Sequence, residues 1–199
     1  MKKIIYYRSA KTASSSIIKG IHESPYESII LSGSSNLNNI DLNKYQIIIV
    51  GVACHPETGA FLNIQKKINK LKNYTSFAVV RDPYDKFVSS INYCNLTNEQ
   101  LLKLYNNNLK LKSHDDVHIL RTQTDALSIN GQFFAQKIIR FENLVNLPNF
   151  FKNHGYDIDV PVCNVTKNKN LKLEQTMIQY VNKTFAIDFK NFGYNYEAV

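Results

Sequence analysis

The sequence has no tryptophan, and its 199 residues include three cysteines, seven glycines and five prolines. Cys54, Cys94 and Cys163 are an odd set, far apart, and they contain no C-x-x-C pair. This spacing argues against a disulfide framework and against a zinc ribbon. No apolar run approaches the roughly 18 residues that a membrane span needs, and no basic leader with an apolar core is present. We therefore expect a cytoplasmic protein without a membrane span.

Acidic residues are in the minority, because 24 lysines and arginines face 16 aspartates and glutamates and give a net charge of +8. That excess favours anionic partners, which include nucleic acid, phosphorylated or sulfated small molecules, acidic glycans and anionic membranes. A nucleic-acid binder would gather its basic residues in a stripe with interleaved aromatic residues. Here the lysines scatter over several predicted helices, so nucleic acid is not the expected partner.

Short strand-like runs alternate with helical patterns along the chain. The runs that are typical of strands are residues 4–7, 28–31, 46–50, 76–80 and 137–141. The helical patterns cover residues 61–71, 84–93, 98–109, 113–127, 144–151 and 173–185. Runs that are apolar at every position suit strands covered on both faces. We predict a single α/β domain over residues 1–199, with a mainly parallel central sheet flanked by helices and an aromatic C-terminal tail docked on its core.

The stretch from Lys3 to Ile21 predicts a strand, a tight loop and a helix. Its loop is basic and built of small residues, and the serine run 14–16 follows. A helix N-terminus carries unpaired N–H groups and a partial positive charge, so it attracts anions. Lys11 adds a full charge, which indicates a P-loop-like phosphate cradle, although the Walker A pattern G-x-x-x-x-G-K-[ST] is absent. A serine-capped helix with a surface lysine explains the same residues.

A second polar segment follows the run 76–80. Arg81 leaves this strand, and Ser89 lies about two helical turns into the next helix. An arginine and a hydroxyl so placed can hold one phosphate, with bidentate donation from the guanidinium. Arg81 in an ion pair with Asp82 or Asp85 at the sheet edge is the alternative. Because ligands bind outside the carboxyl ends of parallel strands, residues 8–11, 54–57 and 81–83 are expected to converge on one crevice.

The segments YYRSAKTASSSI (6–17) and FAVVRDPYDKFVSSINY (77–93) together resemble the sulfotransferases that use 3′-phosphoadenosine-5′-phosphosulfate (PAPS), particularly the carbohydrate branch. In that family the first loop reads Pro-Lys-Thr-Gly, and here Ala10-Lys11-Thr12-Ala13 replaces it. The later RFENL (140–144) and DFKNFGY (188–194) are similar to the family's last strand and C-terminal tail. The resemblance therefore spans nearly the whole chain.

The resemblance implies that PAPS is the co-substrate, that no metal is needed, and that a hydroxyl, expected to be on a carbohydrate, accepts the sulfuryl group. Lys11 would stabilise charge on the bridging oxygen, while Arg81 and Ser89 would bind the 3′-phosphate. The full donor-binding set that it implies is Arg8, Lys11, Thr12, Ala13, Ser14, Ser15, Ser16, Arg81, Ser89 and Lys167. Lys167 would belong to a loop closing over the nucleotide; a solvated basic loop is the alternative. The family also lines its acceptor or nucleotide site with the region of Arg121 and Gln123.

A base must take the proton of the acceptor hydroxyl. His55 is the first candidate, because it follows the strand pattern 46–50 at a carboxyl end and Glu57 is close in sequence. A loop histidine without a role is the alternative. His22 or Glu23, at the end of the first helix, is the second choice.

Other chemistries were weighed against this one. A nucleotide-dependent kinase of P-loop-like build is an alternative, as is a non-enzymatic protein that binds nucleic acid or another anion. His114 and His118 have the i, i+4 spacing of metal ligands, but a third ligand is not apparent, and Ser113 with two following acids is a good helix start. A thiol nucleophile at Cys54, activated by the adjacent His55, is not expected, since sequence neighbours on a strand point to opposite faces. Cys54 is expected to be a structural cysteine instead.

Overall fold

A five-stranded parallel sheet forms the centre of the molecule. The computed structural model describes residues 2–32, 35, 37–51, 59–106, 108–111, 113–163 and 174–198, with the backbone alone at 113 and 114. The sheet order is β2-β3-β1-β4-β7, and all four neighbouring pairs are parallel. The strands are β1 (Lys3–Arg8), β2 (Ser28–Leu31), β3 (Ile47–Gly51), β4 (Tyr74–Val80) and β7 (Lys137–Arg140). The predicted α/β class with a mainly parallel, helix-flanked sheet is confirmed.

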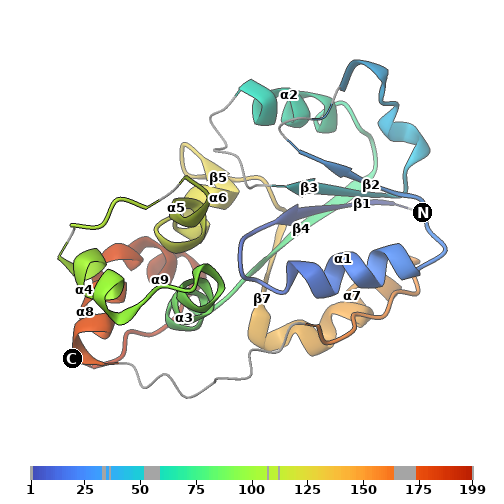
Figure 1. Cartoon of the computed structure of the whole chain (residues 1–199). Helices are drawn as coiled ribbons and strands as arrows, with labels where there is room; N and C mark the ends of the chain where they lie inside the picture. The colour runs from blue at the N-terminus through green and yellow to red at the C-terminus, as the bar shows by residue number, and fades with distance from the viewer. Residues whose placement is uncertain are drawn as a thin grey trace.

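Helices cover both faces of this sheet. α1 (Ser14–Glu23) and α7 (Leu147–Lys152) lie on one face, and α2 (Gly59–Ile68) lies on the other (Figure 1). The alternation of β1 divides its side chains between the two layers. Ile4 and Tyr6 pack with α1 and α7, whereas Ile5 and Tyr7 pack with α2. All four are fully buried, which explains why this strand has no polar alternation.

A third helical layer gathers beyond the carboxyl ends of the strands (Figure 1). Its members are α3 (Pro83–Cys94), α4 (Asn98–Tyr105), α5 (Ser113–Ile119), α6 (Gln123–Leu127), α8 (Gln175–Thr184) and α9 (Ala186–Phe192). Phe87 on α3 and Val181 on α8 are fully buried in its core. This layer stands where a parallel sheet is expected to bind its ligand.

Two predicted helices are divided in the structure. The segment 113–127 forms α5 and α6, because Thr122 interrupts the helix and its side chain accepts a hydrogen bond from the Asp125 N–H at 2.9 Å. The segment 144–151 is a 3-10 helix, η3 (Phe141–Asn146), followed by α7 with Pro148 in its first turn. The predicted helix 98–109 ends at Tyr105 as α4.

Several short elements were not predicted. A hairpin of β5 (Ser128–Ile129) and β6 (Gln132–Phe133) turns at Asn130-Gly131, where both φ angles are positive (51° and 76°), as Asn-Gly turns favour. The loop before β3 contains the 3-10 helices η1 (Leu37–Asn39) and η2 (Leu42–Lys44). The aromatic tail docks on the core as expected, but its first half is the helix α9.

Residues 156–163 run along α1 and touch it closely at Gly20. A Cβ built at Gly20 would lie 2.0 Å from the Asp159 carbonyl oxygen, a separation that a backbone contact cannot tolerate. One turn earlier, the Cys163 N–H donates to Ser16 Oγ at 3.0 Å. These contacts fix α1, and therefore its N-terminal loop, against the C-terminal half of the chain.

Gly20→Ala should therefore lower the free energy of unfolding by about 1–3 kcal/mol, because the added methyl overpacks a backbone contact. Urea denaturation measures the change. Gly59→Ala, at the start of α2, is the matched control, since nothing lies within 4 Å of a Cβ there; its change should stay within about 0.5 kcal/mol. Equal effects of the two substitutions would contradict the close approach.

Candidate functional site

The parallel pairing of β1 with β4 brings two loops together. The register matches Tyr7 with Ala78, so both strands end at the same edge of the sheet. Residues 9–13 follow β1, and Arg81-Asp82 follow β4. The expected convergence of residues 8–11 with 81–83 is therefore present, while residues 54–57, including His55 and Glu57, lie outside the described residues.

The loop 9–13 has an unusual backbone conformation. Lys11 and Ala13 both have positive φ angles, 61° and 59°. The Thr12 hydroxyl is buried and donates to the Ser9 carbonyl at 3.1 Å, which ties the loop to itself. Left-handed residues other than glycine are strained and concentrate where a loop has a binding task.

No serine side chain caps α1. Its N-cap is Ala13, whose side chain cannot accept a hydrogen bond, and Ser14, Ser15 and Ser16 occupy the first three helical positions. The serine-capped alternative is therefore wrong. The first N–H groups of a helix have no partner within the helix, so they can face an anion at the mouth of the loop. Ser14 and Ser16 are buried, and Ser15 is exposed.

Lys11 is half-buried at this mouth and turns toward α3. Its Nζ lies 4.1 Å from the centroid of the Tyr93 ring, a cation–π contact. Burial lowers the pKa of the Lys11 ammonium, nearby Cys94 raises it, and the positive charge of Arg81 lowers it further. Among the described residues, no carboxylate forms an ion pair with Lys11.

The Arg81 guanidinium is held with most of its donors unused. Its Cζ lies 4.4 Å from the centroid of the Phe141 ring, and one Nη is 3.5 Å from Asp85 Oδ2. The Nε atom is buried and has no hydrogen-bond partner within the described part of the chain. The Asp85 side chain is 61% exposed, so this ion pair contributes only about 0–1 kcal/mol. The ion-pair alternative is thus correct in its partner Asp85, but the pair is weak and open to exchange.

The backbone of Arg81 is fixed more firmly than its side chain. The Gln123 side chain accepts a hydrogen bond from the Arg81 N–H at 2.7 Å and donates one to the Arg81 carbonyl at 2.8 Å. Gln123 is fully buried, and so is Asp188 on α9, which accepts from the Gln123 N–H at 2.7 Å and the Thr124 N–H at 2.8 Å. The family resemblance pointed to the region of Gln123, but this role for its amide was not predicted.

A buried lysine joins the same cluster. Lys86 on α3 is 1% exposed, and its Nζ donates to the Arg121 carbonyl at 2.8 Å. Burial lowers the pKa of Lys86 to about 8, Asp188 raises it, and Arg121 lowers it. This lysine therefore ties α3 to the segment that carries Gln123.

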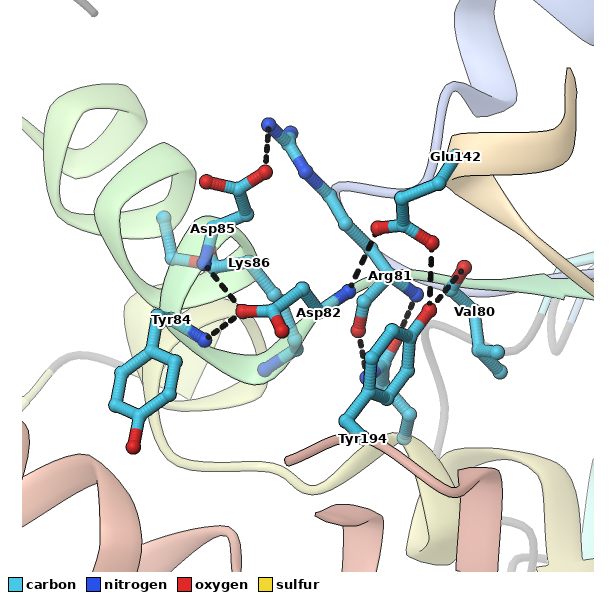
Figure 2. Close-up of polar contacts among 10 residues, drawn as sticks. Val80, Arg81, Asp82, Tyr84, Asp85, Lys86, Glu142 and Tyr194 are labelled. Atoms are coloured by element: carbon cyan, nitrogen blue, oxygen red, sulfur yellow. Dashed lines mark hydrogen bonds and ion pairs between the residues drawn. The ribbon is translucent and has the colours of Figure 1, made fainter. Parts of the chain in front are cut away.

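Asp82, the other polar residue of the strand end, has a structural role. Its carboxylate accepts from the N–H groups of Tyr84 and Asp85 at 2.9 and 3.3 Å and caps α3, as Figure 2 shows. Its own N–H donates to Glu142 Oε1 at 3.2 Å, and Glu142 also accepts from the Tyr194 hydroxyl at 2.9 Å. Through Glu142, Tyr194 of the C-terminal tail is thereby linked to the residue that follows the end of β4, on the side where β7 lies.

Of the remaining residues that the sequence singled out, some lie near the two loops and others lie away from them or outside the described residues. Ser89 is half-buried on α3, and no described residue hydrogen-bonds to its side chain. Arg8 is exposed at the end of β1, and Lys167 lies outside the described residues. The His118 ring lies 4.8 Å from the Tyr93 ring, between centroids, while the side chain of His114 lies outside the described part of the structure. The second-choice bases, His22 and Glu23, are exposed at the far end of α1.

Comparison with protein-family models finds no match, and no curated protein is significantly similar to this chain. The described residues contain no group of three or more metal-ligating side chains. Within the same residues, no helix has the length and apolarity needed to cross a membrane.

The strain at Ala13 leads to a prediction. The left-handed region costs a residue with a Cβ about 1–2 kcal/mol, while the greater freedom of glycine in the unfolded chain costs about 0.5–1 kcal/mol. Ala13→Gly should therefore raise the free energy of unfolding by up to about 1 kcal/mol, as urea denaturation would show. Ala10→Gly is the matched control, because Ala10 has no positive φ; it should leave stability unchanged or lower it. A loss of stability in both variants would contradict the loop conformation.

Proposed function

We propose that the protein is a PAPS-dependent sulfotransferase that transfers a sulfuryl group to a hydroxyl, with a carbohydrate as the acceptor. The observation that carries the proposal is the parallel pairing of β1 with β4, which brings the loop of Lys11 and the strand end of Arg81 to one edge of the sheet. Two cations at one sheet edge that have no strong carboxylate partner among the described residues favour a bound anion. The whole chain would act as one domain, with β1, the loop 9–13 and α1 as its P-loop-like element.

The 3′-phosphate of the donor is assigned to Arg81 and Ser89. A guanidinium has five N–H donors, and the described residues use one Arg81 donor, in the long contact with Asp85. Phosphate oxygens can take two donors side by side and displace this exposed carboxylate. Stacking on Phe141 keeps the guanidinium plane in place during the exchange. Ser89, two turns along α3, would add a hydroxyl donor.

The 5′-phosphosulfate is assigned to the loop 9–13 and the first turn of α1. The acceptor oxygen would attack sulfur while the bond from sulfur to the bridging oxygen breaks, and adenosine 3′,5′-bisphosphate would leave. Negative charge grows on the bridging oxygen in this step, and the Lys11 ammonium would move from the Tyr93 ring to stabilise it. No covalent intermediate with the protein is needed, because positioning and electrostatic stabilisation suffice for transfer between oxygens.

The proton of the acceptor hydroxyl requires a base, and His55 keeps this assignment from the sequence. The resemblance to carbohydrate sulfotransferases in the segments 6–17 and 77–93 supports the donor and the acceptor class. The loop geometry, the orientation of Lys11 and the unused donors of Arg81 support the donor site independently of that resemblance.

Calorimetry with adenosine 3′,5′-bisphosphate and AMP tests the donor assignment. The bisphosphate should bind more than tenfold more tightly than AMP, since a buried charged contact contributes roughly 2–5 kcal/mol. Arg81→Ala should abolish this difference and leave AMP affinity within about twofold. Lys19→Ala, which removes an exposed positive charge on α1, is the control and should keep the preference. Equal affinity of the wild-type protein for the two nucleotides would refute the proposal.

Lys11→Ala tests the transfer step. Because the charge that Lys11 stabilises grows in the transition state, kcat should fall on the order of a hundredfold or more. The affinity for adenosine 3′,5′-bisphosphate should fall much less. Steady-state kinetics at saturating PAPS, compared with Lys19→Ala, gives the measurement. Normal turnover at saturation, with weak nucleotide binding, would reduce Lys11 to a binding residue.

A further inference from the structure

We propose that Gln123 is a positioning residue for phosphate recognition, because its side chain orients Arg81 by hydrogen-bonding to both the N–H and the carbonyl of that residue. This inference rests on the proposed function, in which Arg81 reads the 3′-phosphate. It assigns Gln123 no contact with the nucleotide. Its basis is the pair of hydrogen bonds, 2.7 Å and 2.8 Å, between one side-chain amide and the N–H and carbonyl of Arg81.

Arg81 directly follows the last residue of β4, where the chain leaves the sheet. The register of β4 with β1 ends at Ala78, and its register with β7 ends at Val80. Beyond these pairs no strand of the described residues neighbours the Arg81 backbone. A primary amide offers one acceptor and N–H donors in nearly the geometry of a peptide group. The Gln123 side chain therefore continues the ladder for one more residue, at the point where β4 becomes α3.

Gln123 is itself held rigidly. It begins α6, and Asp188 of α9 accepts from its N–H and from that of Thr124. Lys86 of α3 donates to the Arg121 carbonyl, two residues before Gln123. All three side chains, of Gln123, Asp188 and Lys86, are at most 1% exposed. The segment that clamps Arg81 is thus fastened to α3 and α9, which belong to the same helical layer.

The two hydrogen bonds between the Gln123 side chain and the Arg81 backbone form a clamp, and this clamp acts only on the half of the donor site that is assigned to the 3′-phosphate. Arg81 depends on Gln123 for its backbone orientation, and its guanidinium is otherwise held by Phe141 and the weak pair with Asp85. The loop 9–13 follows a different strand, and no described hydrogen bond joins it to Gln123. Loosening the clamp should therefore weaken recognition of the 3′-phosphate and spare the groups that face the 5′ end.

The experiment measures the ratio of AMP to adenosine 3′,5′-bisphosphate dissociation constants by calorimetry, in the full chain. Gln123→Met keeps the side-chain size and removes both hydrogen bonds to Arg81, together with the long one to Asp188 at 3.5 Å, so the ratio should fall at least fivefold while AMP affinity stays within about twofold. Gln123→Glu can still accept from the Arg81 N–H, but it replaces the donor by an oxygen that repels the Arg81 carbonyl and Asp188 Oδ2, so the ratio should again fall at least fivefold.

Gln136→Ala is the matched control, because that glutamine also binds the backbone of β4. Its Oε1 accepts from the Ser76 N–H at 3.1 Å, and Ser76 lies in β4, five residues before Arg81. This variant should keep the ratio within about twofold.

An unchanged ratio in folded Gln123→Met, or equal losses for both nucleotides, would give Gln123 a purely structural role and overturn the inference. If Gln123→Met does not fold, the ratio of dissociation constants is measured in Gln123→Glu instead. A ratio in that variant equal to the wild-type ratio overturns the inference as well. The wild-type arm separates the two proposals. A wild-type protein without preference for the bisphosphate refutes the donor site itself, whereas a wild-type preference that survives in the Gln123 variants refutes only the positioning role.

Discussion

The parallel pairing of β1 with β4 is the constraint on which the candidate site depends. In a parallel pair both strands run in the same direction, so the loops that follow them leave from one edge. The register that matches Tyr7 with Ala78 ends the strands almost level. The loop that carries Lys11 therefore leaves the sheet at the same edge as Arg81, although 70 residues separate the two in the sequence. A slip in this register would also turn the alternating side chains of β1 to the wrong layers. The same apolar packing thus builds the sheet and sets the spacing of the two cations.

Bringing these cations together is unfavourable by itself. Burial lowers the pKa of Lys11, nearby Cys94 raises it and the charge of Arg81 lowers it, so the surroundings of Lys11 as a whole disfavour its charged form. The nearby partners are weak: an aromatic face for Lys11 and an exposed carboxylate for Arg81. A bound polyanion would supply the missing charge at once. Lys11 and Ala13 also have left-handed backbone conformations, and such strain clusters at functional sites.

The sequence predicted the strands, the loop and the order of the elements, because continuous apolar runs and Pro-containing helix starts are local signals. Ile4 to Tyr7 could be recognised as a buried strand from its own residues. The hydrogen bonds from Gln123 to Arg81 could not be recognised in this way, because Gln123 reaches Arg81 only when Asp188 of α9 holds α6 in place. Thr122 is a local signal of the break in the predicted helix 113–127, since its hydroxyl caps α6. The contact of Lys11 with Tyr93 likewise depends on how α3 leaves the sheet.

Arg81 combines a fixed backbone with a guanidinium that is only lightly held, and this combination suits the recognition of a phosphate. A side chain bound tightly by protein carboxylates would have to lose those bonds before a ligand could use them, and the loss would offset the gain. A side chain on a loose backbone would lose conformational entropy on binding. Here the backbone is ordered in advance by Gln123, and the guanidinium plane rests on Phe141 with its Nε buried and unbonded within the described residues. The backbone of Arg81 is therefore ordered without a ligand, and most N–H donors of its guanidinium make no hydrogen bond within the described residues. A residue that served only to end the strand in an ion pair would show the opposite arrangement, with a saturated guanidinium and no need for a buried amide behind it.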